Sequence, residues 1–235
     1  MTCYYIDVPD GTNNFYKVVN TMTTIEKILA DPRTNKNMHT YVRTLYNVAN
    51  EHYDELNVVG GEYCHINGQL SECCIACCIN PATAKKSSSK AEKLDIKFDD
   101  ITIECKQGES RIANFNRDGS FKDATHSKFL AFLPRFDIHK NIEKSIRIVR
   151  YDLALDYIFN NTKVVVRGKN SGEPEYVTLK IRFKLLSQEH IDNLASLGFT
   201  LDEFKEYITS DHENIKVDYR KVDKMIIEKW NTWNR

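Results

Sequence analysis

The spacing of apolar residues predicts a helical N-terminal part of the chain. Apolar positions recur at helical spacing through residues 17–56, where the polar run DPRTNKN (31–37) separates two helices. A further helix is expected in QLSECCIACCI (69–79), after the glycines of NVVGGEYCHING (57–68) have broken the pattern. This helix should end before NPATAKKSSSK (80–90), because the residue that precedes a proline is disfavoured in a helix.

The middle of the chain carries short runs that are typical of β-strands. Residues 163–186 predict two strands around a turn marked by glycine and proline, and KFLAFLPRFDI (128–138) contains the continuous apolar run of a buried element. Residues 142–159 predict a strand or helix followed by a helix. The region from Gly108 to Gly119 contains glycine and asparagine, and the sequence pattern assigns no helix or strand to it.

The C-terminal part, about 187–235, is expected to be helical, with Ser187 and Thr200 as N-caps. Helices, then strands, then mixed elements predict an α/β (α+β) fold with a central mixed sheet flanked by helices. At 235 residues and 41% hydrophobic content, we expect one domain over residues 1–235.

The charge composition limits the class of partner. The chain has 33 Lys and Arg residues against 33 Asp and Glu residues, so its formal net charge is zero. This balance argues against nucleic-acid binding through a large uniform basic field, but it leaves a local basic groove open.

The sequence also favours an intracellular protein. Its longest apolar runs fall short of the roughly 18 residues that a membrane span needs, and the N-terminus lacks a signal-peptide pattern. An odd count of seven cysteines suits a reducing compartment better than a disulfide framework. We therefore expect a cytoplasmic protein without a membrane partner.

Acidic residues interrupt two adjacent strand-like runs, KLDIKF (93–98) and ITIECK (101–106). Side chains alternate between the two faces of a strand, so the apolar residues share one face and the polar residues Asp95, Glu104 and Lys106 share the other. If Asp99 and Asp100 form a two-residue loop, the expected cross-strand pairs are Phe98 with Ile101, Ile96 with Ile103, and Asp95 with Glu104.

Directly opposed residues have Cβ atoms about 4.5–5.5 Å apart, so the carboxylates of Asp95 and Glu104 would repel each other unless a cation lies between them. Mg²⁺ is usually held by one or two carboxylates, waters and substrate phosphate, and the backbone carbonyl of Cys105 could complete the set. Lys106 would orient a metal-activated water and stabilise developing negative charge during phosphodiester cleavage. The alternative is an exposed hairpin in which a lysine simply neutralises two acids.

The segment LDIKFDDITIECK (94–106) resembles the core of the PD-(D/E)xK nuclease superfamily, whose pattern is an Asp on one strand and (Asp/Glu)-x-Lys on the next. Asp95 matches the first acid, and Glu104-Cys105-Lys106 matches the second half, although Leu94 replaces the proline. The resemblance implies a restriction-endonuclease-like fold, Mg²⁺ as cofactor with Mn²⁺ as a possible substitute, and an auxiliary acid on the preceding helix, here Glu72.

By this resemblance the protein is expected to be an endonuclease that hydrolyses double-stranded DNA and acts as a homodimer. A type II restriction enzyme or a related phage or mobile-element nuclease is the closest description. Two other classes stay open: a non-catalytic nucleic-acid-binding or interaction module, and an RNA-directed nuclease of the same fold.

Nucleic-acid contact requires cations near the hairpin, and three segments offer them. The candidate residues are Lys85, Lys86, Lys90, Lys93, Arg147, Arg150, Lys180, Arg182 and Lys184. Solvated strand faces are an equally good interpretation, because lysine at a sheet edge also discourages aggregation.

Two other clusters contain chemically active residues. The cysteines between Cys64 and Cys78, with His65, have the residue types of a zinc site but not its usual spacing, so we interpret them as apolar core residues of a helix. His126, His139 and Asn141 suggest a nuclease with a histidine base, but the ββα pattern that such a site requires is not visible.

Overall fold

A computed structural model describes residues 22–52, 62–84, 95–98, 101–107, 109–116, 127–133, 136–161, 165–167, 176–182 and 187–210, with residues 224, 227 and 228. The helices of this part are α1 (Thr24–Ala30), α2 (Lys36–Glu51), α4 (Glu62–Ile79), α5 (Tyr151–Asn161), α6 (Gln188–Ser196) and α7 (Leu201–Thr209), with a 3-10 turn η1 (Glu143–Ser145). The strands are β1 (Ile96–Phe98), β2 (Ile101–Gln107), β3 (Glu109–Asn116), β4 (Phe129–Leu133), β5 (Arg147–Arg150), β6 (Val165–Arg167), β7 (Tyr176–Arg182) and β8 (Gly198–Thr200).

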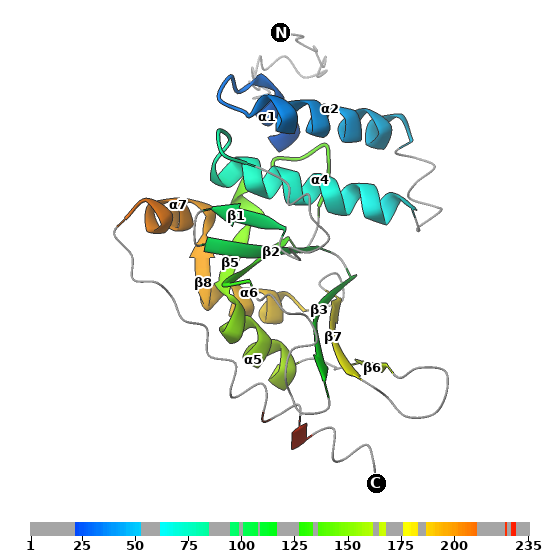
Figure 1. Ribbon diagram of the computed structural model, residues 1–235, viewed down its shortest axis with the longest axis vertical. Helices are drawn as coiled ribbons and strands as arrows, with labels where there is room; N and C mark the ends of the chain where they lie inside the picture. Colours follow the sequence, from blue (N-terminus) through cyan, green and yellow to red (C-terminus); the bar gives the residue numbers. More distant parts are fainter. Residues whose placement is uncertain are drawn as a thin grey trace, which may run out of the picture.

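These strands form two sheets. The larger sheet has the order β1-β2-β4-β5-β8 and is mixed, because β2 and β4 run parallel while its other neighbours are antiparallel. The smaller sheet, β3-β7-β6, is antiparallel. Gly108 alone separates β2 from β3, so the chain passes directly from the larger sheet into the smaller one (Figure 1).

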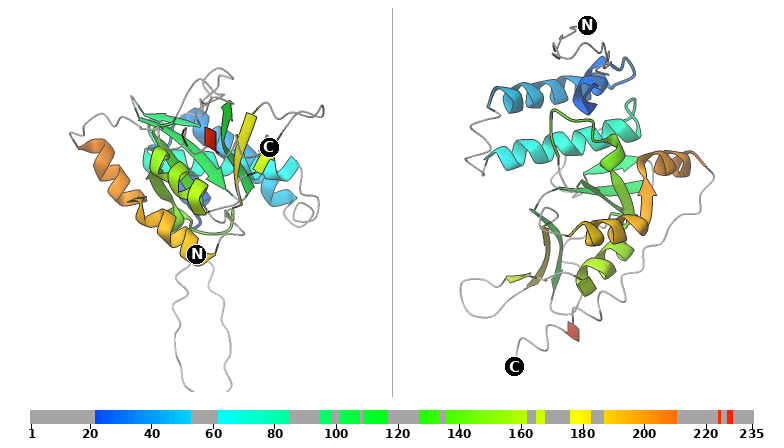
Figure 2. Two further views of the ribbon diagram at one scale, coloured as in Figure 1. Left: turned by 90° about the horizontal axis from the view of Figure 1, so that it is seen from below. Right: turned by 180° about the vertical axis from the view of Figure 1, so that it is seen from behind.

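Helices cover both faces of the five-stranded sheet, which confirms the predicted α/β arrangement. Helices α1, α2 and α4 are stacked on one side, and α5 and α6 lie on the other (Figures 1 and 2). The central strand β4 is buried along its whole length, as the apolar run predicted. Phe129, Ala131 and Leu133 join the core formed with α4 and α7, while Leu130 and Phe132 point to the opposite layer.

Helix α4 begins at Glu62, so the prediction that glycines delay its start until residue 69 is wrong. Gly68 lies inside the helix, where glycine costs about 1 kcal/mol relative to alanine. Packing offsets this cost, because Leu70, Ile75 and the cysteines of the next turns are buried against the core. The predicted end of the helix before Pro81 is confirmed, since α4 ends at Ile79.

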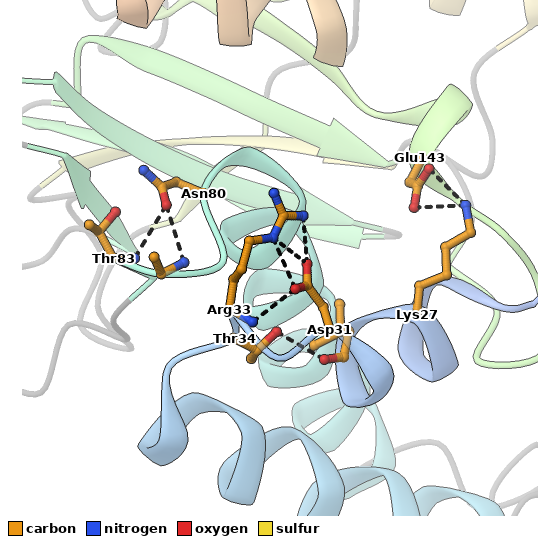
Figure 3. A network of polar contacts seen from close by, with 9 residues as sticks. Lys27, Asp31, Arg33, Thr34, Asn80, Thr83 and Glu143 are labelled. Atoms are coloured by element: carbon orange, nitrogen blue, oxygen red, sulfur yellow. Dashed lines mark hydrogen bonds and ion pairs between the residues drawn. The ribbon is translucent and has the colours of Figure 1, made fainter.

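Contacts with loops attach the two N-terminal helices to the rest of the protein, and Figure 3 shows one of them, between Lys27 and Glu143. The backbone N–H of Asn35, the N-cap of α2, donates to the carbonyl of Pro81 at 2.9 Å. Lys27 donates from Nζ to both carboxylate oxygens of Glu143 at 3.1 Å. The buried hydroxyl of Thr24 accepts from the N–H of Ile142 at 2.9 Å, which ties α1 to the loop after β4.

Two strands lie where none was expected. β3 occupies most of the region between Gly108 and Gly119, and β8 interrupts the predicted C-terminal helices. The predicted N-caps of α6 and α7 are confirmed: Ser187 accepts from the N–H of His190, and Thr200 forms a capping box with Glu203. In the predicted helix at the C-terminus, the described residues 224, 227 and 228 are helical.

Gly198 is required by the close approach of β8 to β5. A Cβ at this position would lie 2.4 Å from the carbonyl oxygen of Ile148 and 2.8 Å from the Cα of Val149, and both are backbone atoms that cannot rotate away. We expect Gly198→Ala to lower the free energy of unfolding by about 1–3 kcal/mol. Urea denaturation measures this, with the exposed Ser196→Ala as a control that should stay within about 0.5 kcal/mol of wild type. Equal stability of both variants would contradict the close approach.

Candidate functional site at the β1–β2 hairpin

The strand register of the hairpin is the predicted one. Phe98 pairs with Ile101 and Ile96 with Ile103, while Asp99 and Asp100 lie outside the described residues. One further step along this register sets Asp95, which directly precedes β1, opposite Glu104. The local reason is the alternation of the two runs, because a shift by one residue would expose Ile96, Ile101 and Ile103.

The neighbouring strand gives the charged face an apolar border. On β2, Ile101, Ile103 and Cys105 are buried toward α4, and Glu104 and Lys106 point to the other face. The parallel register places Glu104 beside Leu130 and Lys106 beside Phe132 of β4. Both apolar residues are fully buried, so the two charges lie where electrostatic interactions are stronger than in water.

Lys106 and Glu104 form a direct ion pair in which both side chains are largely buried, with 15% and 18% of their surface exposed. Burial alone would lower the pKa of Lys106, but the carboxylates of Glu104 and Asp95 outweigh it and leave that pKa above its ordinary value. Lys106 is therefore an ammonium ion at neutral pH. This favours charge stabilisation over proton abstraction as its chemical role.

Asp95 is held at the edge of the sheet by the backbone of β2. Its Oδ2 accepts a hydrogen bond from the N–H of Cys105 at 2.7 Å. The N–H and C=O of one strand residue point to the same side of the strand, so the Cys105 carbonyl also faces this edge. Asp95, Glu104 and the Cys105 carbonyl are thus oxygen donors at one end of the hairpin.

Glu72 reaches the same neighbourhood from α4. Burial raises the pKa of the Cys105 thiol well above its ordinary value, and the charges of Asp95, Glu72 and Glu104 raise it further. Since the Cys105 thiol points toward α4, Glu72 approaches β2 from the face opposite to Lys106. The structure thus gathers Asp95, Glu104 and Lys106 and places Glu72 across the strand from them.

These oxygen atoms suit a hard cation that takes only part of its coordination shell from the protein. Within the part of the chain that the structure describes, no three side chains of His, Cys, Asp or Glu are grouped as metal ligands. Two carboxylates and one carbonyl would supply the protein's share, leaving the remaining positions to water and substrate phosphate, as is usual for Mg²⁺.

The two predicted DNA contacts on β5 already have intramolecular partners. Arg150 donates to buried Asp152 through Nε at 3.2 Å and Nη2 at 2.7 Å. Arg147 donates from Nη1 to the carbonyls of Lys144 at 2.6 Å and Ile146 at 2.9 Å. The strand registers place Arg147 beside Phe132 and thus on the same face as Lys106, two strands away.

The predicted contacts on β7 gain an unexpected neighbour. Lys180 lies opposite Arg111 of β3, and Arg182 lies opposite Glu109. We did not predict Arg111, because no strand was predicted between Gly108 and Gly119; the alternation of apolar and polar residues from Ala113 to Asn116 was the available signal. The other candidates lie outside the described residues: Lys85, Lys86, Lys90, Lys93 and Lys184.

The cysteines of α4 lie in the apolar core. Cys73, Cys74 and Cys77 are buried and reduced, and Cys78 is partly buried. Cys64 lies where side chains are not described, and His65 is exposed. For the histidine alternative, His139 lies in an exposed turn and Asn141 Oδ1 accepts from the N–H of Glu143, while His126 is outside the described residues.

In comparisons with known proteins, no family model, no curated protein and no solved structure matches the chain. The likeness to PD-(D/E)xK nucleases therefore rests on residues 94–106 alone. Among the described helices, none has the length and apolar character needed to cross a membrane.

Buried thiols of α4 should be chemically inert in the folded protein. Burial and the nearby Glu143 raise the pKa of Cys78 to about 12, and burial also raises the pKa values of Cys74 and Cys77. At pH 8 the reactive thiolate of Cys78 is then about a thousandfold rarer than for a thiol with the ordinary pKa. We expect iodoacetamide to spare these cysteines in the native state and to modify them in urea, as mass spectrometry of peptides would show. Rapid native labelling of Cys74 or Cys77 would contradict their burial.

The ion pair should contribute to stability as a unit. Lys106→Gln removes the ammonium that contacts Glu104, so we expect a clear loss of stability that a second change, Glu104→Gln, partly reverses. The coupling energy from the double-mutant cycle should be about 1–3 kcal/mol by urea denaturation. The exposed Lys97→Gln on β1 carries the same charge change and should couple to Glu104→Gln by less than about 0.5 kcal/mol. If Lys97 and Lys106 couple equally to Glu104, then Lys106 acts on Glu104 only through long-range electrostatics and not through direct contact.

Proposed function

We propose that the protein is a Mg²⁺-dependent endonuclease that hydrolyses phosphodiester bonds of double-stranded DNA at the open end of the β1–β2 hairpin. In this proposal Asp95, Glu104 and the carbonyl of Cys105 are the metal ligands. Lys106 stabilises negative charge at the reacting phosphate, and Glu72 is an auxiliary acid behind β2. A restriction-type, homodimeric enzyme is the form that the sequence resemblance favours, with Mn²⁺ as an alternative metal.

One observation carries the proposal: two carboxylates occupy opposed positions where the hairpin opens, and an ammonium ion lies against them. Like charges directly across an antiparallel pair destabilise it, so this position requires positive charge. The charges of Glu104 and Asp95 both raise the pKa of Lys106, so the three groups interact at one place. A divalent cation would bind to the carboxylate oxygens, and it would allow Lys106 to turn toward a phosphate oxygen.

The residues then have distinct chemical tasks. A bound Mg²⁺ would polarise the phosphodiester and lower the pKa of a coordinated water. Asp95 and Glu104 would hold their oxygens toward the hairpin end, where the backbone of Cys105 fixes Asp95. Lys106, charged at neutral pH, would stabilise the extra negative charge that develops on the phosphoryl oxygens.

A second candidate function is a non-catalytic nucleic-acid-binding module. The observation that favours it is the ion pair itself, because Lys106 and Glu104 satisfy each other by direct contact. In that case the hairpin is a structural element, and only the basic residues of the strands contact nucleic acid.

Cleavage assays with supercoiled plasmid, linear duplex and RNA separate these functions. Wild type should cleave the DNA substrates only with Mg²⁺ or Mn²⁺, and Asp95→Asn, Glu104→Gln and Lys106→Gln should each lower the rate by about 100-fold or more. Lys97→Gln is the matched control on the same hairpin and should keep the wild-type rate, because its side chain is exposed and its cross-strand partner is the uncharged Thr102.

The remaining outcomes contradict the proposal in different ways. Binding of DNA without any metal-dependent cleavage would favour the non-catalytic module. Cleavage of RNA in preference to both DNA substrates would assign the site to an RNA-directed nuclease. Cleavage that Glu104→Gln leaves intact would place the chemistry elsewhere.

A further inference from the structure

Arg147 lies at the same end of the larger sheet as the candidate site. The registers set Lys106, Phe132 and Arg147 in one row across β2, β4 and β5, so the two cations share a face. Arg147 donates from Nη1 to the carbonyls of Lys144 at 2.6 Å and Ile146 at 2.9 Å. Because both carbonyls precede β5, these bonds hold the guanidinium toward the end of the sheet where β2 terminates.

A single nitrogen of this guanidinium makes both bonds, which fixes the group and leaves its other nitrogens available. An arginine has five N–H donors in a planar fork, and three of them are on Nε and Nη2. Within the described part of the chain, these two nitrogens of Arg147 have no acceptor. Arg150 differs, since its Nε and Nη2 both donate to buried Asp152. A fork that is already held in place suits bidentate binding of a phosphate.

Lys144 adds a second positive charge beside Arg147. Its side chain is exposed, and it forms no ion pair with a residue that the structure describes. The nearby acids of the preceding loop have other partners. Asp137 pairs with Lys140 at 3.0 Å. Glu143 contacts the ammonium of α1 at 3.1 Å, so neither acid neutralises Lys144.

Glu203 of α7 interacts with Arg147 only at longer range. Hydrogen bonds from the side chain and the backbone of Thr200 lower the pKa of Glu203, and the charge of Arg147 lowers it further. Its Oε2 accepts both bonds from Thr200 at 2.7 Å, as the capping box of α7 requires. We call Lys144 and Arg147 the corner cations. Among the described residues, no carboxylate forms an ion pair with either of them.

We infer that the corner cations bind a phosphate that flanks the one at Lys106, on the same DNA duplex; this inference rests on the proposed function. Neighbouring strands lie about 4.8 Å apart, so two strand steps separate the backbones of Lys106 and Arg147 by about 10 Å. Each strand of a duplex carries one phosphate per roughly 3.4 Å of axis, so this distance spans about three nucleotides. Fully buried Phe132 lies between the two cations in the row, so they meet different phosphates. A second phosphate contact would fix the register of the duplex on the metal site.

Metal-free binding of a fluorescent duplex of about 20 base pairs tests the inference without cleavage. Anisotropy is measured in EDTA from about 50 to 300 mM salt. The Lys144→Gln/Arg147→Gln variant should bind about tenfold more weakly at about 100 mM salt. Its slope of log K against log salt should be shallower by about 2, because each phosphate contact contributes about 0.9. The charge-preserving Lys144→Arg/Arg147→Lys variant should restore the slope, which separates loss of charge from loss of fold.

The matched control is Lys36→Gln/Arg43→Gln, which removes the same charge from exposed positions of α2, on the opposite side of the larger sheet from α5 and α6 (Figure 1). It should keep the wild-type affinity and slope. Equal binding by the corner variant and the α2 control would overturn the inference, as would a wild-type protein that binds no duplex. If the corner variant binds normally while wild type cleaves DNA with Mg²⁺, this inference fails and the proposed nuclease stands. Binding through the corner cations without any cleavage would refute the nuclease and leave the phosphate contact standing.

Discussion

The fold depends on burying β4 on both faces. Five consecutive apolar residues from Phe129 to Leu133 are almost completely inaccessible to water, and no single helix can cover both sides of a strand. One side is covered by α4 and α7, with Phe129 packed edge-on against Phe204 at 5.1 Å between ring centroids. The other side requires α5 and α6. Each fully buried phenylalanine contributes about 1.5–3 kcal/mol relative to an exposed one, so this strand organises both layers.

The charged end of the hairpin is a consequence of that arrangement. β2 pairs with β4 in a parallel register, and its inner residues Ile103 and Cys105 extend the first layer. Its alternate residues must then point to the layer of Leu130 and Phe132, where water is scarce. Glu104 and Lys106 are at these positions, and the direct contact between them offsets part of the cost of burying charge. Their proximity to apolar residues makes the position sensitive to any further charge, whether a metal ion or a phosphate.

Local patterns predicted much of this structure because they depend on neighbouring residues only. The alternation around Ile96 and Ile103 fixed the hairpin register, and the apolar run after Lys128 identified β4. The start of α4 and the strands β3 and β8 could not be predicted in this way. Gly68 is tolerated because the helix packs on a core formed from distant segments, and β8 exists because β5 offers an open edge. At the site, sequence predicted which side chains share a face, but the ion pair of Lys106 and the pairing of Arg111 with Lys180 depend on three-dimensional contacts.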